Sequence, residues 1–285
     1  MMERKERHTD RYGDGAARMV AVCAVMTALL LAVQCALSFV AGVELVTAFL
    51  LVFCYVFGAK YGMVTATAFS LLRNFIFGFA PDVIALYLIY FNGFALVFGA
   101  MGKRRGHWAE YVCPALVLLL AAGALALAIL GLPVSPLMAA RLEVMLWALF
   151  AVLLALFVGS VVLLFLGGRV RIGHEVAVLA SLAAFCTVCF TLLSDVITPL
   201  FYGWSMDVAI GYFYTGFFAM VPQTLCAAVS VTLLFYPLER AFFMVLPPVR
   251  KKRLEALLRA RMARKRGGAE QIPPSNDGRT QKDMV

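Results

Sequence analysis

The sequence predicts an all-α fold: a polytopic transmembrane helical bundle of about eight spans with both termini in the cytoplasm. Of its 285 residues, 63% are hydrophobic, against about 45 to 50% in soluble proteins even when Gly is counted. Only 14% are charged, and mean hydropathy is +0.91. Long uncharged runs recur from residue 19 to residue 238. This composition excludes a disordered chain, a disulfide scaffold and an outer-membrane barrel.

Eight segments are apolar enough to be spans, for which about 20 residues are needed. The first is too long for the apolar core of a signal peptide, and no small-residue cleavage site follows it, so we expect a retained helix. The second is short. The predicted spans cover residues 19–41, 45–59, 61–79, 83–101, 112–131, 143–166, 175–197 and 208–236.

The distribution of Lys and Arg sets the expected orientation, because cytoplasmic connections are enriched in both. With residues 1–18 inside, every inner connection is basic, since these connections contain Lys60, residues 103–105, Arg169 with Arg171, and the tail. The outer connections hold Glu44, Asp82, Arg141 with Glu143, and Asp207. The sequence therefore predicts three parts: a cytoplasmic segment at 1–18, a bundle at 19–240 and a cytoplasmic tail at 241–285.

The formal charge of +9 is concentrated in that tail. Residues 250–266 contain nine basic residues and only Glu255 as an acid, so the bundle is nearly neutral and the charge does not indicate nucleic-acid binding. Leu254, Leu258 and Met262 recur at helical spacing there, which is typical of a basic helix on anionic membrane lipid or in a partner's groove. The structural alternative is a basic stop that only fixes the topology of the last span. Residues 267–285 are polar, and we expect them to be disordered.

Ionisable and polar residues within the spans are the candidates for function, because they are costly in lipid. Arg73 lies 13 residues beyond Lys60, about 20 Å along a helix, and Asp195 lies 20 residues beyond Glu175, about 30 Å. Both therefore belong to the outer half of the bundle, where several aromatic side chains also gather and could stack a planar ring. The candidate substrate-binding residues are Glu44, Arg73, Asn74, Asp82, Tyr87, Asn92, Asp195, Tyr202, Trp204, Tyr212 and Gln223.

Each of these residues also has a structural interpretation. The aromatic residues could form an interfacial belt, Arg73 could snorkel or pair with Asp195 or Glu44, and Asp82 could cap the helix that follows it. The seven Cys and three His residues show no metal-binding spacing, and no phosphate loop or hydrolase motif is present. We therefore expect that the protein is not an enzyme and that it binds neither a metal nor a cofactor.

Three stretches between Glu44 and Arg105 resemble a known family. They are Glu44-Leu45-Val46-Thr47, Phe57-Gly58-Ala59-Lys60-Tyr61-Gly62 and Leu72-Arg73-Asn74-Phe75-Ile76-Phe77-Gly78-Phe79, and a hydrophobic span ending in Lys103-Arg104-Arg105 follows them. Together they resemble the substrate-binding S component of energy-coupling factor (ECF) vitamin transporters. Residues 186–240, ending in Tyr236-Pro237-Leu238-Glu239-Arg240, are similar to that family's last two helices. The resemblance covers about two thirds of the chain.

The resemblance implies a six-span core, to which residues 106–172 would add an inserted helical pair. It also implies contact with a transmembrane coupling subunit, which in turn binds a pair of cytoplasmic ATPases. S components make that contact through small residues on the first helix, and here Ala24, Ala28 and Ala32 recur every four residues. Such a stripe allows another helix to pack closely, either a partner's helix or one of this bundle's own.

The function expected from these observations is capture of a vitamin-like or heterocyclic micronutrient at the outer face of a prokaryotic cell membrane, for ATP-driven uptake by partner subunits. A stand-alone secondary transporter is the alternative, with Asp195 or Glu44 as its proton or sodium site. A membrane enzyme acting on lipid is the second alternative.

Overall fold

The computed structural model describes residues 2–40, 42–104, 108–130, 135–167 and 173–245. The predicted basic segment at 250–266 and the tail at 267–285 lie outside these residues, as do Arg105, Arg169 and Arg171. Residues Met1–Phe242 belong to one compact unit, and all packing described below lies within it.

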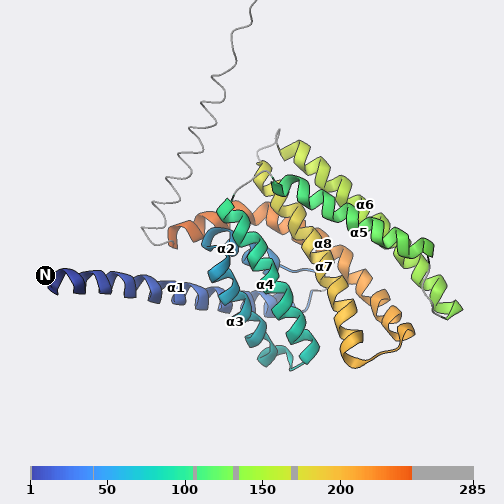
Figure 1. Ribbon diagram of the computed structural model, residues 1–285, viewed down its shortest axis with the longest axis horizontal. Helices are drawn as coiled ribbons and strands as arrows, with labels where there is room; N and C mark the ends of the chain where they lie inside the picture. The colour runs from blue at the N-terminus through green and yellow to red at the C-terminus, as the bar shows by residue number, and fades with distance from the viewer. Residues whose placement is uncertain (1, 41, 105–107, 131–134, 168–172, 246–285) are drawn as a thin grey trace, which may run out of the picture. The chain divides into compact units, whose positions relative to one another are not determined.

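The described residues are helical and contain no strand, so the all-α prediction is confirmed (Figure 1). Each predicted span corresponds to one helix. The helices are α1 (Met2–Leu37), α2 (Val46–Phe57), α3 (Ala59–Phe77), α4 (Pro81–Arg104), α5 (Trp108–Leu130), α6 (Pro136–Gly167), α7 (His174–Tyr202) and α8 (Met206–Val245).

Five of these helices are long and apolar enough to cross a membrane: Ala16–Leu37 within α1, Pro81–Lys103 within α4, Met138–Val162 within α6, and all of α7 and α8. The other three differ for visible reasons. Helix α2 has only 12 residues, α3 is made more polar by Lys60, Arg73 and Asn74, and the apolar part of α5 begins at Pro114. The chain is thus a multi-pass helical bundle, while eight spans and cytoplasmic termini stay predictions.

The short helix α2 is the buried centre of this unit. Leu50, Phe53 and Cys54 are completely buried. The helix packs against α1, α3, α4 and α7, and the ring of Phe53 lies 5.8 Å from that of Phe242 on α8. Its apolar sequence therefore reflects contact with protein on all sides, which explains why 12 residues suffice here.

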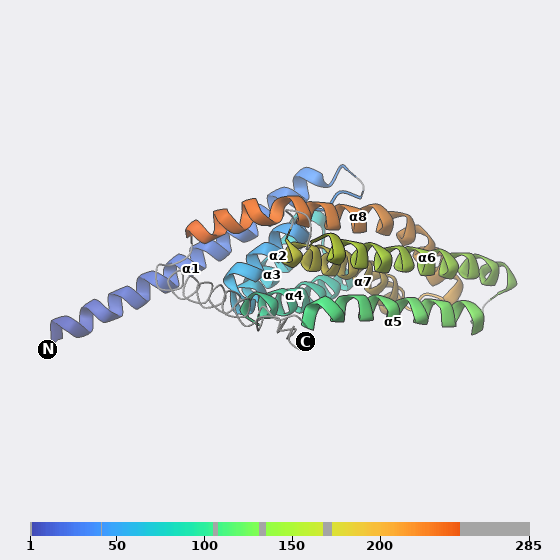
Figure 2. The same cartoon turned by 90° about the horizontal axis from the view of Figure 1, so that it is seen from above.

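Helices α5 and α6 lie side by side in both views (Figures 1 and 2). They pack on α7, and Leu142 and Leu146 of α6 form a small cluster with Ile210 of α8. The segment expected as an inserted helical pair, 106–172, thus supplies two antiparallel neighbours on the α7 and α8 side of the bundle.

Helix α1 has two different faces. Met19, Met26 and Leu30 are buried against the bundle, whereas the alanine stripe of Ala24, Ala28 and Ala32 is exposed. The stripe is therefore accessible to another helix.

Helices α2 and α4 approach closely because α4 carries glycine where they cross. A Cβ atom at Gly102 would collide with the carbonyl oxygen of Tyr55. We expect Gly102→Ala to lower the free energy of unfolding by about 1 to 3 kcal/mol, the usual cost of overpacking, measured by thermal unfolding of the full chain in detergent. Gly93→Ala on the same helix is the matched control, because nothing lies within 4 Å of a Cβ there. Equal stability of both variants would contradict the close approach.

Candidate functional site

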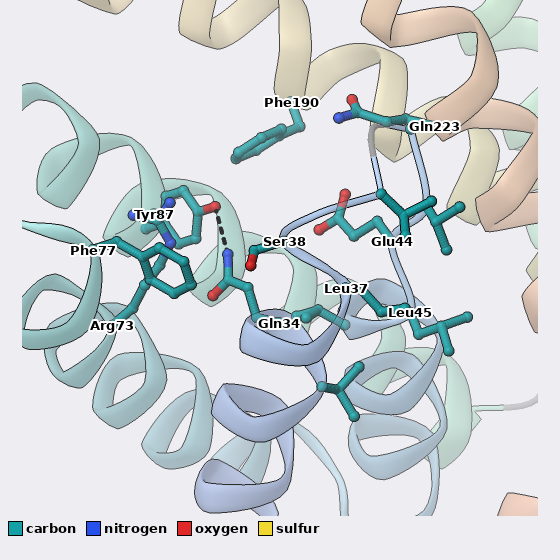
Figure 3. Close-up of a pocket in the computed structure, with 15 residues that line it drawn as sticks. Gln34, Leu37, Ser38, Glu44, Leu45, Arg73, Phe77, Tyr87, Phe190 and Gln223 are labelled. Atoms are coloured by element: carbon teal, nitrogen blue, oxygen red, sulfur yellow. Dashed lines mark hydrogen bonds between the residues drawn. The ribbon is translucent and has the colours of Figure 1, made fainter.

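A cavity of about 290 Å³ lies where the end of α1 and the loop to α2 meet α3, α4, α7 and α8 (Figure 3). The polar and aromatic residues of its wall come from six different parts of the chain. Those that carry the argument are Gln34, Glu44, Arg73, Tyr87, Phe190 and Gln223.

Arg73 supplies the positive charge of the wall. Its guanidinium carbon lies 4.3 Å from the ring centroid of Tyr87 and 4.9 Å from that of Phe77, which is the geometry of cation–π contacts. Its Nε atom is buried without a hydrogen-bond partner. A buried donor without a partner is uncommon and requires an explanation, and here it belongs to a residue that lines a cavity.

The α1 side of the wall is joined to α4 by one hydrogen bond. The amide Nε2 of Gln34 donates to the hydroxyl oxygen of Tyr87 at 3.3 Å, and the ring of Tyr87 packs edge-on against Phe190 of α7 at 5.5 Å. The Oε1 atom of Gln34 is buried and has no hydrogen-bond partner. The wall therefore contains one unmatched acceptor as well as one unmatched donor.

The loop between α1 and α2 places a carboxylate opposite Arg73. Gly42 adopts a positive φ of 81°, and a Cβ atom there would lie 2.8 Å from the Cβ of Pro222 on α8. The Sγ of Cys226, one turn further along α8, donates to the carbonyl oxygen of Glu44 at 3.7 Å. This seating turns the Glu44 side chain toward the cavity, between Ser38 and Gln223 (Figure 3).

The cavity brings together four residues expected at the site: Glu44, Arg73, Tyr87 and Gln223. Sequence reasoning missed Gln34 and Phe190. An amide within an otherwise apolar span was a usable signal for Gln34, by the same argument that identified Arg73. Phe190 is one of 23 Phe residues, and nothing in the sequence distinguishes it from the others.

Two other expected residues are fully hydrogen-bonded within the bundle. Asp82, in the first turn of α4, accepts from Thr198 Oγ1 at 3.0 Å and from Tyr202 OH at 3.2 Å. Asn92 accepts from Thr67 Oγ1 at 3.0 Å and donates to the carbonyl oxygen of Leu88 at 2.8 Å. These side chains, and Tyr202 with them, join α4 to α7 and to α3, and they do not line the cavity.

Asn74 and Asp195 also lie outside the cavity wall, yet each has an unmatched atom. Asn74 donates to the carbonyl oxygen of Ser70 at 2.6 Å, while its Oδ1 is buried without a partner. Asp195 Oδ2 is likewise buried without a partner, and the carboxylate lies against Gly216 of α8, where a Cβ atom would be 2.8 Å from Oδ1.

Trp204 and Tyr212 belong to a separate open groove of about 520 Å³ beside Met138 and Asp207. The ring of Trp204 stacks on Tyr202 at 5.8 Å and meets Tyr212 edge-on at 5.4 Å. The residues expected at one outer site are thus distributed over the cavity, this groove and several interhelical contacts.

Within the described residues, no group of three or more His, Cys, Asp or Glu side chains is placed to hold a metal ion. Comparisons of the chain with protein-family models, with curated proteins and with solved structures found no match.

We expect Asp82→Ala to destabilise the bundle by about 2 to 3 kcal/mol, because a buried hydrogen-bonded charge is lost and two hydroxyl groups lose their acceptor. Tyr202→Phe removes only one of the two bonds and should cost less. Thermal unfolding in detergent measures both. A variant of Asp82 that unfolds like the wild type but binds solute more weakly would instead place Asp82 at a ligand site.

Burial raises the pKa of Glu44 to about 7, and the charge of Arg73 lowers it only in part. Tyr87 and Tyr90 of α4 and Cys226 of α8 are its other titratable neighbours. Because the folded-state pKa lies above the ordinary value of 4.5, the stability contributed by protonated Glu44 is complete below pH 4.5 and is lost as pH rises through 7, by at most about 3 kcal/mol.

Thermal unfolding of the wild type and of Glu44→Gln between pH 4.5 and 8 tests this dependence. The stability of the variant relative to the wild type should rise with pH, since the amide does not ionise. Glu143→Gln, at an exposed carboxylate of α6, is the control and should leave the pH profile unchanged. A Glu44→Gln profile parallel to that of the wild type would contradict the raised pKa.

Proposed function

We propose that this chain is the substrate-binding membrane subunit of an ECF-type importer, which captures a vitamin-like or heterocyclic micronutrient from outside a prokaryotic cell. The observation that carries the proposal is the cavity, where Arg73 and Glu44 both line the wall and buried atoms of Arg73 and Gln34 have no partner. Polar groups left unmatched inside an apolar bundle are costly, and a bound solute would match them.

The contrast with Asp82 and Asn92 supports this assignment. Asp82 and Asn92 are equally polar, yet their side chains are matched by neighbouring hydroxyl and carbonyl groups. The chain is therefore able to satisfy polar groups where they serve packing alone. Asn74 and Asp195 also keep an unmatched atom, but neither lines the cavity. In the cavity wall the unmatched atoms occur together with convergent polar groups and an aromatic lining, which is typical of a small-molecule site.

The exposed alanine stripe supports a partner in the membrane. Ala24, Ala28 and Ala32 are exposed, while the opposite face of α1 is buried. In the proposed complex a transmembrane coupling subunit packs on this stripe and links the chain to a pair of cytoplasmic ATPases. The basic tail would then bind anionic lipid beside that assembly.

One observation favours the alternative of an ion-coupled transporter. Asp195 lies within α7 and has a buried, unmatched carboxylate oxygen, which a proton or sodium ion would satisfy. Uptake by the purified chain alone in proteoliposomes, driven by a proton or sodium gradient and lost in Asp195→Asn, would establish this function in place of the ECF-type one.

Co-purification of the full chain from its native membrane tests the proposal. We expect the affinity-purified protein to retain two ATPase subunits, one further membrane protein and a small molecule released on denaturation. Isolation of the chain free of ATPases and of any released molecule, from membranes solubilised gently enough to keep other ABC importers intact, would overturn the proposal.

We also expect Ala24→Leu with Ala28→Leu to abolish uptake by the assembled complex and to leave ligand affinity within about threefold, because Leu prevents close helix approach. The matched control is Ala151→Leu with Ala155→Leu, an exposed pair with the same spacing on α6. Uptake assays and ligand binding are measured on the same preparations. Unchanged uptake would refute the coupling role of the stripe, and a joint loss of affinity and uptake would assign it to the bundle's own packing.

A further inference from the structure

We infer that the ligand of the cavity is a small aromatic zwitterion, a molecule of one or two rings that carries an acidic and a basic group, with the acid held by Arg73 and the basic group by Glu44 and Gln34. This inference rests on the proposed solute-binding function and specifies its substrate class. It follows from the charges of the lining side chains, from their unmatched polar atoms and from the size of the cavity.

The first step concerns charge. Arg73 contributes one positive charge to the lining, Glu44 contributes one negative charge at pH values above about 7, and every other lining residue is neutral. Figure 3 places these two groups on opposite sides of the cavity, with Gln34 between them. A ligand with a single charge would match one of them and bury the other without a partner, which is costly. A ligand with both charges matches both.

The second step concerns hydrogen bonding. The two unmatched atoms are of opposite kinds: Nε of Arg73 is a donor, and Oε1 of Gln34 is an acceptor. A carboxylate or phosphate accepts from a guanidinium, and an ammonium or protonated ring nitrogen donates to an amide oxygen and a carboxylate. A ligand that carries both an acidic and a basic group would therefore match both of these atoms.

The third step concerns shape and size. Tyr87, Phe77 and Phe190 line the cavity, and aromatic side chains favour stacked or edge-to-face contact with another ring. A volume of about 290 Å³ is at the small end of ligand cavities, which range over about 300 to 1,000 Å³. One or two rings fit this space, and a corrinoid does not.

Three ring-matched probes test the inference: L-phenylalanine, which carries both charges, 3-phenylpropionate, which carries only the acid, and 2-phenylethylamine, which carries only the base. Binding of each to the full chain in lipid nanodiscs at pH 8 is measured by equilibrium dialysis. We expect phenylalanine to bind at least tenfold more tightly than either of the others. A probe with a single charge that binds as tightly as phenylalanine would overturn the inference.

Two variants assign the charges to their partners. Arg73→Gln should lower the affinity for phenylalanine and for 3-phenylpropionate by about 30-fold or more, and it should leave the affinity for 2-phenylethylamine within threefold. Glu44→Gln should lower the affinity for phenylalanine and for 2-phenylethylamine and leave that for 3-phenylpropionate unchanged. Arg141→Gln and Glu143→Gln, the same changes at exposed residues of α6, should affect none of the three. A different pattern in folded variants would overturn the assignment, and the wild-type comparison stands where a variant fails to fold.

If none of the probes binds, the identity of the small molecule released on denaturation of the natively purified chain tests the inference. A released molecule with both acidic and basic groups supports the inference. A molecule with charge of one sign overturns it and leaves the solute-binding function intact. Release of no molecule, together with no probe binding, overturns both.

Discussion

The cost of keeping the guanidinium of Arg73 inside an apolar bundle determines how the surrounding elements are arranged. Two aromatic faces, those of Tyr87 and Phe77, take up part of its charge. Tyr87 is in turn fixed by Gln34 and by Phe190, so α1, α4 and α7 meet around one side chain of α3. Glu44, in the loop between α1 and α2, lines the cavity together with Arg73. Its position depends on Gly42, which lets that loop lie directly on Pro222.

The polar residues of the bundle divide into those that hold helices together and those that remain unmatched. Asp82 and Asn92 each bridge two helices through short hydrogen bonds, and such satisfied contacts contribute to stability without leaving an atom for a ligand. Arg73 and Gln34 retain a buried unmatched atom each. Composition and depth in a span do not separate these two groups; the separation depends on what lies on the neighbouring helix.

Because this distinction depends on residues of neighbouring helices, only part of the site could be predicted from the sequence. Hydrophobic runs of span length predicted eight helices, and the described residues contain a helix for each. Glu44, Arg73, Tyr87 and Gln223 were found because charge, amide or aromatic groups are conspicuous in apolar segments. The partners of Asp82, which lie 116 and 120 residues away, could not be found, since long-range contacts leave no local pattern. The burial of α2 was missed for the same reason, because a short apolar helix looks alike in lipid and in protein.

Helix α1 connects the two surfaces on which the proposed function depends. Gln34 faces the cavity near the end of the helix, and Ala32, two residues earlier, belongs to the exposed stripe. A partner helix packed on that stripe would therefore lie within about one helix diameter, 10 to 12 Å, of the bound solute. Because Gln34 also holds Tyr87, a shift of α1 against a coupling subunit would move a wall of the cavity. The solute and the partner would then influence each other's affinity through this helix, and that influence is reciprocal by thermodynamic linkage.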